Sequence, residues 1–554
     1  MEKRAVVAIV LSLAVWLAWS YFFIKPKQSV HKPATTVKEE PAKKTAPQRE
    51  TARMTVAAVG QGSAREQRLE IATPRYEASL STRGAAIERL LYKERNIELV
   101  VAEKSFNARG SFDFALHLDE NEFLQGGALD NALWNVEKTS ERELRFFTSI
   151  LVNNEQLRVE KRYSFADDGS FFRLTLALQN PGGREIVLPQ KSVIISPSDF
   201  LGPSMDFENT YNELECIYNV DGSFDKGSKG GGIFSKSTDI KKESGATKWV
   251  GIMSRYFLII MVPEKFTGSG AIYDSRKHTA YRTGMYVPVA SIKPRETVTK
   301  SFKVYVGEKN KDRLRAVDES IVEAADVSKW IEPIRDFLIW ALLKINILFG
   351  NFGWSLVIFS IITKVILMPL TIKSTESMKK LQALNPQITE LREKYKDKPD
   401  VLNKKIMEMY KKNKVNPASG CLPLLLQMPF FFALYSALIN SIDLWQAPFV
   451  FWIKDLSLPD TVFNLRDLGI DYYFNFNILP IVMTGTTYLQ QKMSTGDAVG
   501  QQQKMMLMLM PLIFIVIFWN MPSGLVLYWI MQNVLQILHQ LYVNKKGQKE
   551  VKET

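Results

Sequence analysis

The stretch that decides the fold is WSLVIFSIITKVILMP, residues 354–369, an apolar run with one charge near its centre. A run of this kind predicts a membrane-spanning helix, and a lysine in its middle costs about 2.5–3.5 kcal/mol on insertion scales. Lys364 lies roughly 13 Å of helix from either end, which is farther than a lysine side chain can snorkel. The run therefore predicts a water-containing cavity walled by other helices.

No Asp or Glu lies in any of the other long apolar runs, so we expect the charge of Lys364 to be available to a ligand. A structural lysine with a hidden partner is the alternative. Neutral polar residues in these runs are candidates to share the cavity: Ser360, Thr363, Gln427, Thr484, Thr486, Thr487, Gln490, Gln532 and Asn533.

Six membrane spans are predicted in all. Five lie in the second half of the chain, near 352–372, 418–440, 476–491, 505–520 and 524–543, within a helical core of residues 350–543. The sixth is an N-terminal anchor, residues 1–24, whose apolar run ends in aromatic residues without a small-residue cleavage site. A cleaved signal peptide is the alternative for that run.

Basic residues alternate between the predicted loops. Segment 373–416 carries twelve Lys or Arg, whereas 441–475 carries only Lys454 and Arg466. Because basic short loops stay in the cytoplasm, we expect 373–416, the basic tail 544–554 and both termini there, with the large polar part outside. The Lys-rich segment after the first span indicates the opposite, but the rule weakens for long translocated domains.

Segment 373–416 carries two apolar stripes at helical spacing, separated by the turn Lys396–Asp400. This pattern predicts a basic, antiparallel helical hairpin, and a solvated loop held by salt bridges is the alternative. A basic hairpin could recruit acidic headgroups, nascent chains or ribosomal RNA. Its candidate contact residues are Lys379, Lys380, Arg392, Lys394, Lys404, Lys405, Lys411 and Lys412.

Residues 327–349 predict an amphipathic helix, because apolar residues from Ile331 to Leu348 recur at spacings of three and four. Such a helix is suited to the membrane interface, with a buried bundle helix as the alternative. Residues 25–65 are rich in Lys, Pro, Ala and Thr, which predicts a flexible linker.

The region 66–326 shows short β-type runs broken by Gly, Asn, Asp and Pro, which predicts a large antiparallel β-sandwich. It contains no nucleophile elbow and no phosphate loop. We expect His117 to be a strand residue rather than a catalytic base, and the domain to be a binding or scaffolding module.

Composition excludes several other classes. Two cysteines rule out a disulfide framework, and four scattered histidines without ligand spacing argue against a zinc site. The net charge of +13 is concentrated in the linker, the hairpin and the tail. No nucleotide motif occurs, so we expect no cofactor, no enzymatic activity and no specific nucleic-acid partner.

Several motifs together resemble the YidC/Oxa1/Alb3 family of membrane protein insertases, in its long Gram-negative YidC form. They are NFGWS (351–355), MPLT (368–371), VNP (415–417), GCLPLLLQMP (420–429) and PSGLVLYW (522–529) in the apolar half, and WVGIMSRYF (249–257) in the polar half.

This resemblance implies a five-helix insertase core plus an anchor, and a periplasmic β-supersandwich related in fold to sugar mutarotases. It implies a hydrophilic groove open to cytoplasm and lipid but closed towards the periplasm. The groove cation of the family is usually arginine, and Lys364 keeps the charge without the bidentate fork. Gln427 matches a groove position, and Tyr528 with Trp529 match a client-contacting aromatic pair.

The expected function is insertion and folding assistance for inner-membrane proteins, alone or with the Sec translocon. The expected partners are nascent membrane proteins, the Sec translocon, the bilayer and, weakly, the ribosome. A transporter or channel with a periplasmic ligand-binding domain is one alternative, although no internal repeat supports it. A sugar-processing membrane enzyme is another, although the paired His and acidic residues it needs are missing from the polar half.

Overall fold

The computed structural model describes residues 56–58, 65–101, 115–189, 191–202, 214–227, 240–274, 282–325, 331–396, 398–413, 422–465, 469, 474–495 and 501–553. The predicted anchor at 1–24 and most of the predicted linker at 25–65 lie outside these residues. The chain forms two compact units. The first comprises Met1–Phe200, Glu215–Ile252 and Ile259–Tyr305, and the second Leu201–Leu214, Met253–Leu258 and Val306–Thr554.

The first unit is mostly β-sheet, as predicted. Its strands are β1 (Val56–Ala58), β2 (Arg68–Ala72), β3 (Tyr76–Ser81), β4 (Ala86–Tyr92), β5 (Ile97–Val101), β6 (Ala115–His117), β7 (Asn135–Ser140), β8 (Glu143–Val152), β9 (Glu155–Phe165), β10 (Phe172–Gln179), β11 (Ile186–Val187), β12 (Ile194–Ser196), β13 (Glu215–Val220), β14 (Ser223–Gly227), β15 (Ile240–Met253), β16 (Phe257–Glu264), β17 (Gly268–Asp274), β18 (Arg282–Tyr286), β19 (Ser291–Ile292) and β20 (Thr297–Glu308). Two short helices, α2 (Glu120–Gln125) and α3 (Ala128–Asn131), lie between β6 and β7.

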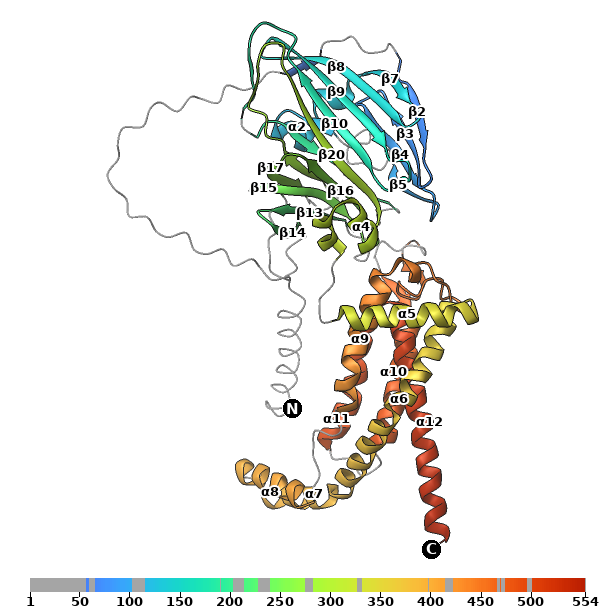
Figure 1. Cartoon of the computed structure of the whole chain (residues 1–554). Coiled ribbons are helices and arrows are strands. Elements are labelled where there is room, and N and C mark those ends of the chain that lie inside the picture. The colour runs from blue at the N-terminus through green and yellow to red at the C-terminus, as the bar shows by residue number, and fades with distance from the viewer. Residues whose placement is uncertain are drawn as a thin grey trace, which may run out of the picture. The chain divides into compact units, whose positions relative to one another are not determined.

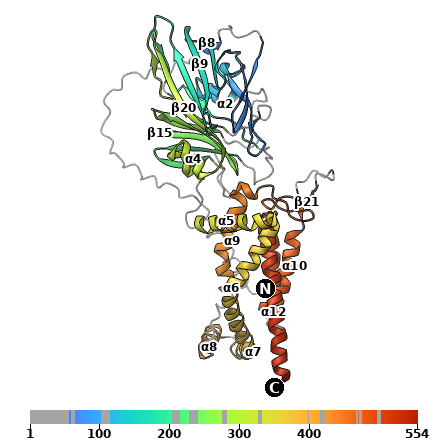
Figure 2. The same ribbon diagram turned by 45° about the vertical axis from the view of Figure 1, so that its right-hand side comes forward.

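The largest sheet has 14 strands, with the order β1-β8-β9-β10-β20-β16-β15-β17-β18-β12-β6 along its main path (Figures 1 and 2). A four-stranded sheet, β2-β3-β4-β5, stands apart from it. In β8 and β9 every second residue is buried, which is the period of a strand with one face on a core. The hydroxyl of Tyr163 on β9 donates to the carbonyl of Ala85, 2.8 Å away at the start of β4, and ties the two sheets together.

The large sheet begins earlier in the chain than predicted. Val56–Ala58 pairs antiparallel with Ile150–Val152, although these residues fall inside the predicted linker. A strand at the edge of a sheet is held by backbone hydrogen bonds, which need no large apolar side chains. Composition alone therefore gave no signal for β1.

A buried polar cluster lies in this unit. His117 belongs to β6, as predicted, and its Nε2 is 3.2 Å from Oδ2 of Asp130. Lys161 on β9 is 1% exposed, and its Nζ donates to the carbonyl of Gly84 at 2.8 Å and lies 5.2 Å from the ring centroid of Trp134. Burial lowers the pKa of Lys161 to about 8, against a smaller opposing effect of Asp130.

The second unit is mostly helical. Its α-helices are α4 (Lys311–Val317), α5 (Glu332–Phe349), α6 (Phe352–Ala383), α7 (Asn385–Lys394), α8 (Pro399–Lys412), α9 (Leu422–Asn440), α10 (Leu479–Thr495), α11 (Gln501–Phe518) and α12 (Ser523–Glu553). Short 3-10 helices cover Glu319–Ala325 and Ile442–Leu444, and a two-stranded ribbon joins β21 (Thr461–Asn464) to β22 (Asn475–Asn477). Helix α12 packs against α6, α9 and α10, and α5 runs across the bundle against α6 and α9 (Figures 1 and 2).

Each predicted span of the second half corresponds to a helix, with different ends. Helix α6 continues to Ala383, eleven residues beyond the predicted end at 372, and α12 continues to Glu553 through the predicted tail. By length and composition alone, one candidate membrane span, Phe352–Ile372, is found within the described residues. The count of six spans therefore stays a prediction.

Most of the stripe predicted along α5 faces the bundle, but its last residue, Leu348, is exposed. Leu338 and Leu342 are fully buried, and Ile334 and Ile345 pack against the same core. A second apolar set is exposed instead and includes Phe337, Trp340, Ile347, Leu348 and Phe349. The helix thus combines the two roles that its periodicity left open, since one face packs in the bundle and another is apolar and exposed.

The segment Met253–Leu258, which carries part of the WVGIMSRYF motif, belongs to the helical unit. Within that unit, Nε of Arg255 donates to the carbonyl of Ile439 at 2.6 Å, and its Nη2 donates to the carbonyl of Ser457 at 3.0 Å. The hydroxyls of Tyr256 and Ser457 are 3.1 Å apart. Arg255 therefore binds carbonyls at the end of α9, where a helix leaves backbone acceptors without partners of its own.

The NFGWS motif at the start of α6 also has a packing role. Nδ2 of Asn351 donates to the carbonyl of Pro448 at 3.0 Å. A Cβ at Gly353 would lie 1.9 Å from the ring of Phe449, so only glycine leaves room for that ring. The motif therefore fixes the loop after α9 against the first turn of α6.

Candidate functional site

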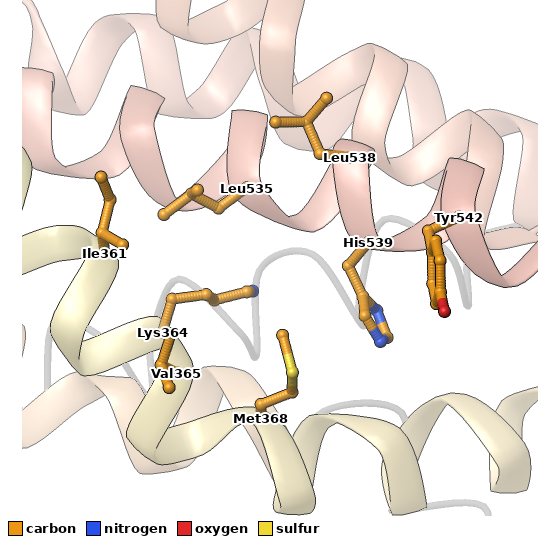
Figure 3. A pocket seen from close by; sticks show the side chains of 8 residues that line it. All are labelled: Ile361, Lys364, Val365, Met368, Leu535, Leu538, His539 and Tyr542. Carbon is orange, nitrogen blue, oxygen red and sulfur yellow. The ribbon is translucent and has the colours of Figure 1, made fainter.

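The side chain of Lys364 lines a cavity between α6 and α12 (Figure 3). Its Nζ donates to Oε1 of Gln536 at 2.6 Å. The cavity measures about 260 Å³ and is lined by Ile361, Lys364, Val365, Met368, Leu535, Leu538, His539 and Tyr542. Within the described residues, the hydrogen-bond partner of Lys364 is thus a neutral amide, and no carboxylate lines its cavity.

Ser360 lies one turn before Lys364 on α6, and Thr363 directly precedes it. Both hydroxyls donate to carbonyls one turn back in the helix, Ser360 to Leu356 at 2.7 Å and Thr363 to Phe359 at 3.0 Å. Nε2 of Gln532 reaches the Ser360 carbonyl at 3.1 Å and the Thr363 hydroxyl at 3.3 Å. This amide bridges α12 to α6 through buried polar groups, which are satisfied pairwise as burial requires.

Gln427 and Tyr528 form a second polar contact, between α9 and α12. Nε2 of Gln427 is 3.5 Å from the hydroxyl of Tyr528, at the limit of a hydrogen bond. On the other flank of α12, Nδ2 of Asn533 donates to the hydroxyl of Thr487 on α10 at 2.8 Å. Polar side chains of α6, α9, α10 and α12 therefore form a strip of separate contacts along α12.

Trp529 belongs to an aromatic cluster. Its ring centroid lies 5.7 Å from that of Phe431, 5.4 Å from that of Phe514 and 5.2 Å from that of Phe518. Edge-to-face packing of this kind stabilises the helix contacts beyond the burial of apolar area. In this conformation Trp529 packs α9, α11 and α12 together and is 8% exposed.

The structure thus divides the predicted site residues into three groups. Ser360 and Thr363 meet through Gln532, Gln427 meets Tyr528, and Lys364 lies in its own cavity. Three residues of that cavity region were not predicted: Gln536, His539 and Tyr542. These residues follow Gln532 at positions 536, 539 and 542, so all four polar residues lie on one face of a helix. This polar stripe was the sequence signal that could have predicted them.

The basic hairpin is built from α7 and α8, which pack together through Leu384, Ile388, Ile406, Met409 and Tyr410. Lys379 and Lys380 lie on the end of α6 instead, and the side chain of Lys379 is outside the described residues. The remaining predicted contact residues are exposed: Lys380, Arg392, Lys394, Lys404, Lys405, Lys411 and Lys412. Lys405 forms an ion pair with Glu408 at 2.9 Å.

Within the described residues, no group of three or more His, Cys, Asp or Glu is arranged to hold a metal ion. The site instead offers one cation, several amides and hydroxyls, and apolar walls. Such a surface can bind and release a polar segment of a chain, but it supplies no nucleophile with an adjacent base.

Comparison with known families follows the same division of the chain. Residues 68–341 match the family described as "YidC periplasmic domain", and residues 344–550 match the family described as "60Kd inner membrane protein". A membrane protein insertase YidC from Pelobacter propionicus is 32% identical over 570 residues, covering 98% of this chain and 99% of the relative. The chain belongs to the YidC family of membrane protein insertases. The resemblance seen in the motifs is therefore confirmed.

A second relative also matches nearly the whole chain, and two solved structures match parts of it. The YidC insertase of Geobacter metallireducens is 32% identical over 98% of both chains. A solved structure described as an active YidC insertase covers 86% of this chain at 16% identity, with a TM-score of 0.37. A galactose mutarotase-like protein from Lactobacillus casei covers 43% of this chain at 10% identity, with a TM-score of 0.32.

Membership in the YidC family makes this chain an inner-membrane protein insertase with a periplasmic domain, and not an enzyme. Two of the alternatives raised by the sequence, a transporter or channel and a sugar-processing enzyme, are set aside by this result.

Proposed function

We propose that clients enter the bilayer along the polar strip of α6, α9, α10 and α12, and that Lys364 attracts carboxylates in the flank that must cross. The observation that carries this proposal is the neutral partner of Lys364. Its ammonium donates to the Gln536 amide, which a carboxylate can replace with a stronger, charge-assisted bond. The client helix then partitions into lipid, driven by its own apolar surface.

The hydroxyls and amides of the strip would serve a different step. Polar residues of the client lose water as they pass between helices, and unsatisfied polar groups in an apolar medium cost several kcal/mol. Ser360, Thr363, Gln427 and Tyr528 can exchange their present contacts for contacts with the client. Trp529 would contact the client only after its aromatic cluster with Phe431, Phe514 and Phe518 opens.

The proposed topology has six spans, with both termini in the cytoplasm and the β-rich unit in the periplasm. Its support is the charge of the connecting segments, since 373–416 carries twelve basic residues. In this topology the α7–α8 hairpin faces the cytoplasm and receives clients, weakly assisted by the ribosome. Cooperation with the Sec translocon, which the resemblance of the motifs implies, is proposed as well.

The electrostatic step is tested by replacing Lys364. We expect Lys364→Ala to lower insertion of single-span clients with acidic tails by at least about tenfold, the lower end of the value of a charge-assisted bond. Lys364→Arg should insert them normally because it retains the charge. The measurement is protease protection of the client tail in proteoliposomes.

Lys492→Ala is the matched control, since it removes an exposed cation from α10 outside the cavity. Clients with uncharged tails provide the second control and should be affected less than acidic ones. Normal insertion of acidic tails by Lys364→Ala would show that the electrostatic step is wrong.

The role of the hairpin is tested separately from its fold. Replacing Lys404, Lys405, Lys411 and Lys412 with Gln removes charge from α8 and leaves the apolar contact between α7 and α8 unchanged. We expect weaker crosslinking of ribosome-bound clients, with a steeper loss at low salt, where exposed charges act over longer distances. If the variant crosslinks clients as strongly as the unmodified chain, the hairpin only connects two helices and does not recruit clients.

A further inference from the structure

One phenylalanine of the helical unit protrudes from its surface. Phe451 lies in the loop between α9 and β21 and is 91% exposed, the largest exposed fraction of any large apolar side chain within the residues that the structure describes. Its ring stacks on that of Trp452, with the centroids 6.0 Å apart. Exposure alone would be ordinary for an isolated apolar residue, but the backbone that carries this one is not ordinary.

The backbone of Phe451 is held in the left-handed region, with a φ of 58°. Phe451 follows Val450 in a tight turn, in which the amide of Ile453 donates to the carbonyl of Val450 at 3.3 Å and the amide of Phe449 donates to the carbonyl of Ile453 at 3.0 Å. Glycine and asparagine adopt this conformation readily, whereas a bulky side chain does so at a cost in free energy. Residues strained in this way concentrate at sites that bind something. We call residues 449–453 the Phe451 turn.

The Phe451 turn stands on a fixed base. Nε1 of Trp452 donates to Oδ2 of Asp460 at 2.9 Å. The same carboxylate oxygen accepts from the backbone amides of Ile478 and Leu479 at the start of α10, at 2.9 and 2.7 Å. Asp460 is only 4% exposed, so these bonds are shielded from water. The ring of Phe451 is therefore presented by a rigid turn and not by a loose loop.

The turn lies at the end of the candidate membrane span of α6. The ring of Phe449 occupies the space beside Gly353, and its centroid lies 5.3 Å from that of Trp354, in the first turn of α6. The span begins at Phe352, so the hydrocarbon core begins near this level. Two residues of chain reach at most about 7 Å, and the interfacial layer of a bilayer is about 5–8 Å thick on each side. Phe451 therefore lies within about one interfacial layer of the edge of the hydrocarbon core.

We propose that the Phe451 turn binds lipid, with the ring of Phe451 inserted between headgroups and acyl chains of the leaflet in which α6 begins. Aromatic side chains concentrate at this depth. Lys454, exposed three residues later, can extend its ammonium to the headgroups. The contact with lipid offsets the cost of the left-handed backbone. The inference rests on α6 crossing the bilayer, and it depends neither on Lys364 nor on which way the termini face.

A lipid fits this ring better than a protein partner does. A stable protein interface buries about 800 Å² on each partner, whereas one aromatic side chain contributes roughly 150–250 Å². The turn offers little further apolar area, because Val450 and Trp452 are half-buried and Lys454 is charged. Acyl chains are fluid and can surround a single ring without a complementary surface.

Photo-crosslinking from position 451 tests the proposal in the full chain without a client. Benzoylphenylalanine replaces Phe451, the protein is reconstituted at a large excess of phosphatidylethanolamine and phosphatidylglycerol, and lipid adducts are counted by mass spectrometry after irradiation. The same residue at Lys138, exposed on β7, is the matched control. We expect at least about tenfold more lipid adduct from position 451, which corresponds to burial of one phenylalanine side chain. Equal yields from both positions, or crosslinks from 451 to a second copy of the chain in place of lipid, would overturn the proposal.

A bimane label provides an independent measurement with a smaller probe. Cysteine is placed at position 451 in a Cys421→Ser chain, in which the native Cys216 is fully buried. Lipids that carry a doxyl group close to the headgroup should quench this label more than lipids that carry it at the end of the acyl chain. Quenching by aqueous iodide without quenching by either lipid would place the side chain in water, and the proposal would be wrong.

Two variants separate the ring from the fold of the turn. Phe451→Asn relieves the strained φ, so the turn should form at least as well, whereas Phe451→Trp keeps an aromatic ring. With bimane on cysteine at Lys454, the Asn variant should lose most of the lipid quenching and the Trp variant should keep it. Full quenching in Phe451→Asn would show that the ring does not hold the turn in the leaflet. Since Lys364→Ala leaves this turn unchanged, the lipid measurements and the insertion assay can fail independently.

Discussion

Lys161 is a fully buried lysine in the β-rich unit, held by the carbonyl of Gly84 and the ring of Trp134. Its pKa falls to about 8 from a usual value of 10.5 because burial disfavours the charged form. Between these two values the unfolded chain binds more protons than the folded chain. The contribution of Lys161 to the free energy of unfolding therefore rises as the pH increases from 8 towards 10.5. The rise is at most about 1.4 kcal/mol per pH unit.

We expect this rise to disappear in Lys161→Met, which has no titrating group at the site. The measurement is the unfolding free energy of the β-rich unit in denaturant at pH 8, 9 and 10, taken as the difference between the unmodified chain and the variant. Lys138→Met, at an exposed position of β7, is the matched control and should show no difference in slope. Parallel pH profiles for Lys161→Met and the unmodified chain would contradict the assignment.

At the residue scale, one charge in an apolar run was enough to predict Lys364 and a cavity around it. Its partner Gln536 and its neighbour His539 were missed, because a helix face can be read from periodicity but its rotation towards another helix cannot. Contacts such as that of Arg255 with the carbonyl of Ile439 were equally hidden. They join residues 184 positions apart, and backbone acceptors carry no sequence signature.

Helix α5 shows, for a whole element, that periodicity does not determine how a helix is rotated towards its neighbours. Its existence and its end at Phe349 followed from the 3.6-residue period, whereas its start lies at Glu332 and not at the predicted 327; the period also cannot say which of two apolar faces packs inside. In the structure Leu338 and Leu342 are buried, while Trp340 is 56% exposed. Trp340 and its exposed neighbours are suited to the boundary of the bilayer, where aromatic side chains concentrate.

A nitroxide label tests that placement. A label on cysteine at position 340 should collide more with oxygen than with a water-soluble nickel complex, because oxygen concentrates in lipid. A label at Lys138, exposed on β7 of the β-rich unit, should show the opposite preference. The background requires Cys421→Ser, whereas Cys216 is fully buried. Equal accessibility at both positions would contradict the interfacial role.

For the whole molecule, the contrast between a polar half and an apolar half predicted a boundary at 326, whereas the second compact unit begins at Val306 and also includes Met253–Leu258. The order of the 14 strands was not predictable. Neighbours such as β10 and β20 pair across more than a hundred residues, for example Leu178 with Val298. Each strand shows only its own alternation, and partner choice depends on long-range packing that no local pattern contains.

The topology of the whole chain makes a prediction of its own. A membrane-impermeant maleimide added to intact spheroplasts should label cysteine placed at Lys138 in the β-rich unit. It should not label cysteine at Lys396 in the hairpin until the membrane is permeabilised. Both positions are exposed, and burial raises the pKa of the native Cys216 thiol, which lowers its background reaction. Labelling of position 396 in intact spheroplasts would reverse the proposed orientation.

Helix α6 runs without interruption from Phe352 to Ala383, so one rod about 48 Å long carries both Lys364 and the base of the hairpin. Pro369 is the one break in its ladder of hydrogen bonds, since proline cannot donate to the carbonyl of Val365. Pro369 is therefore the point of α6 at which the helix bends most readily, and it lies five residues after Lys364, between the charge and the base of the hairpin.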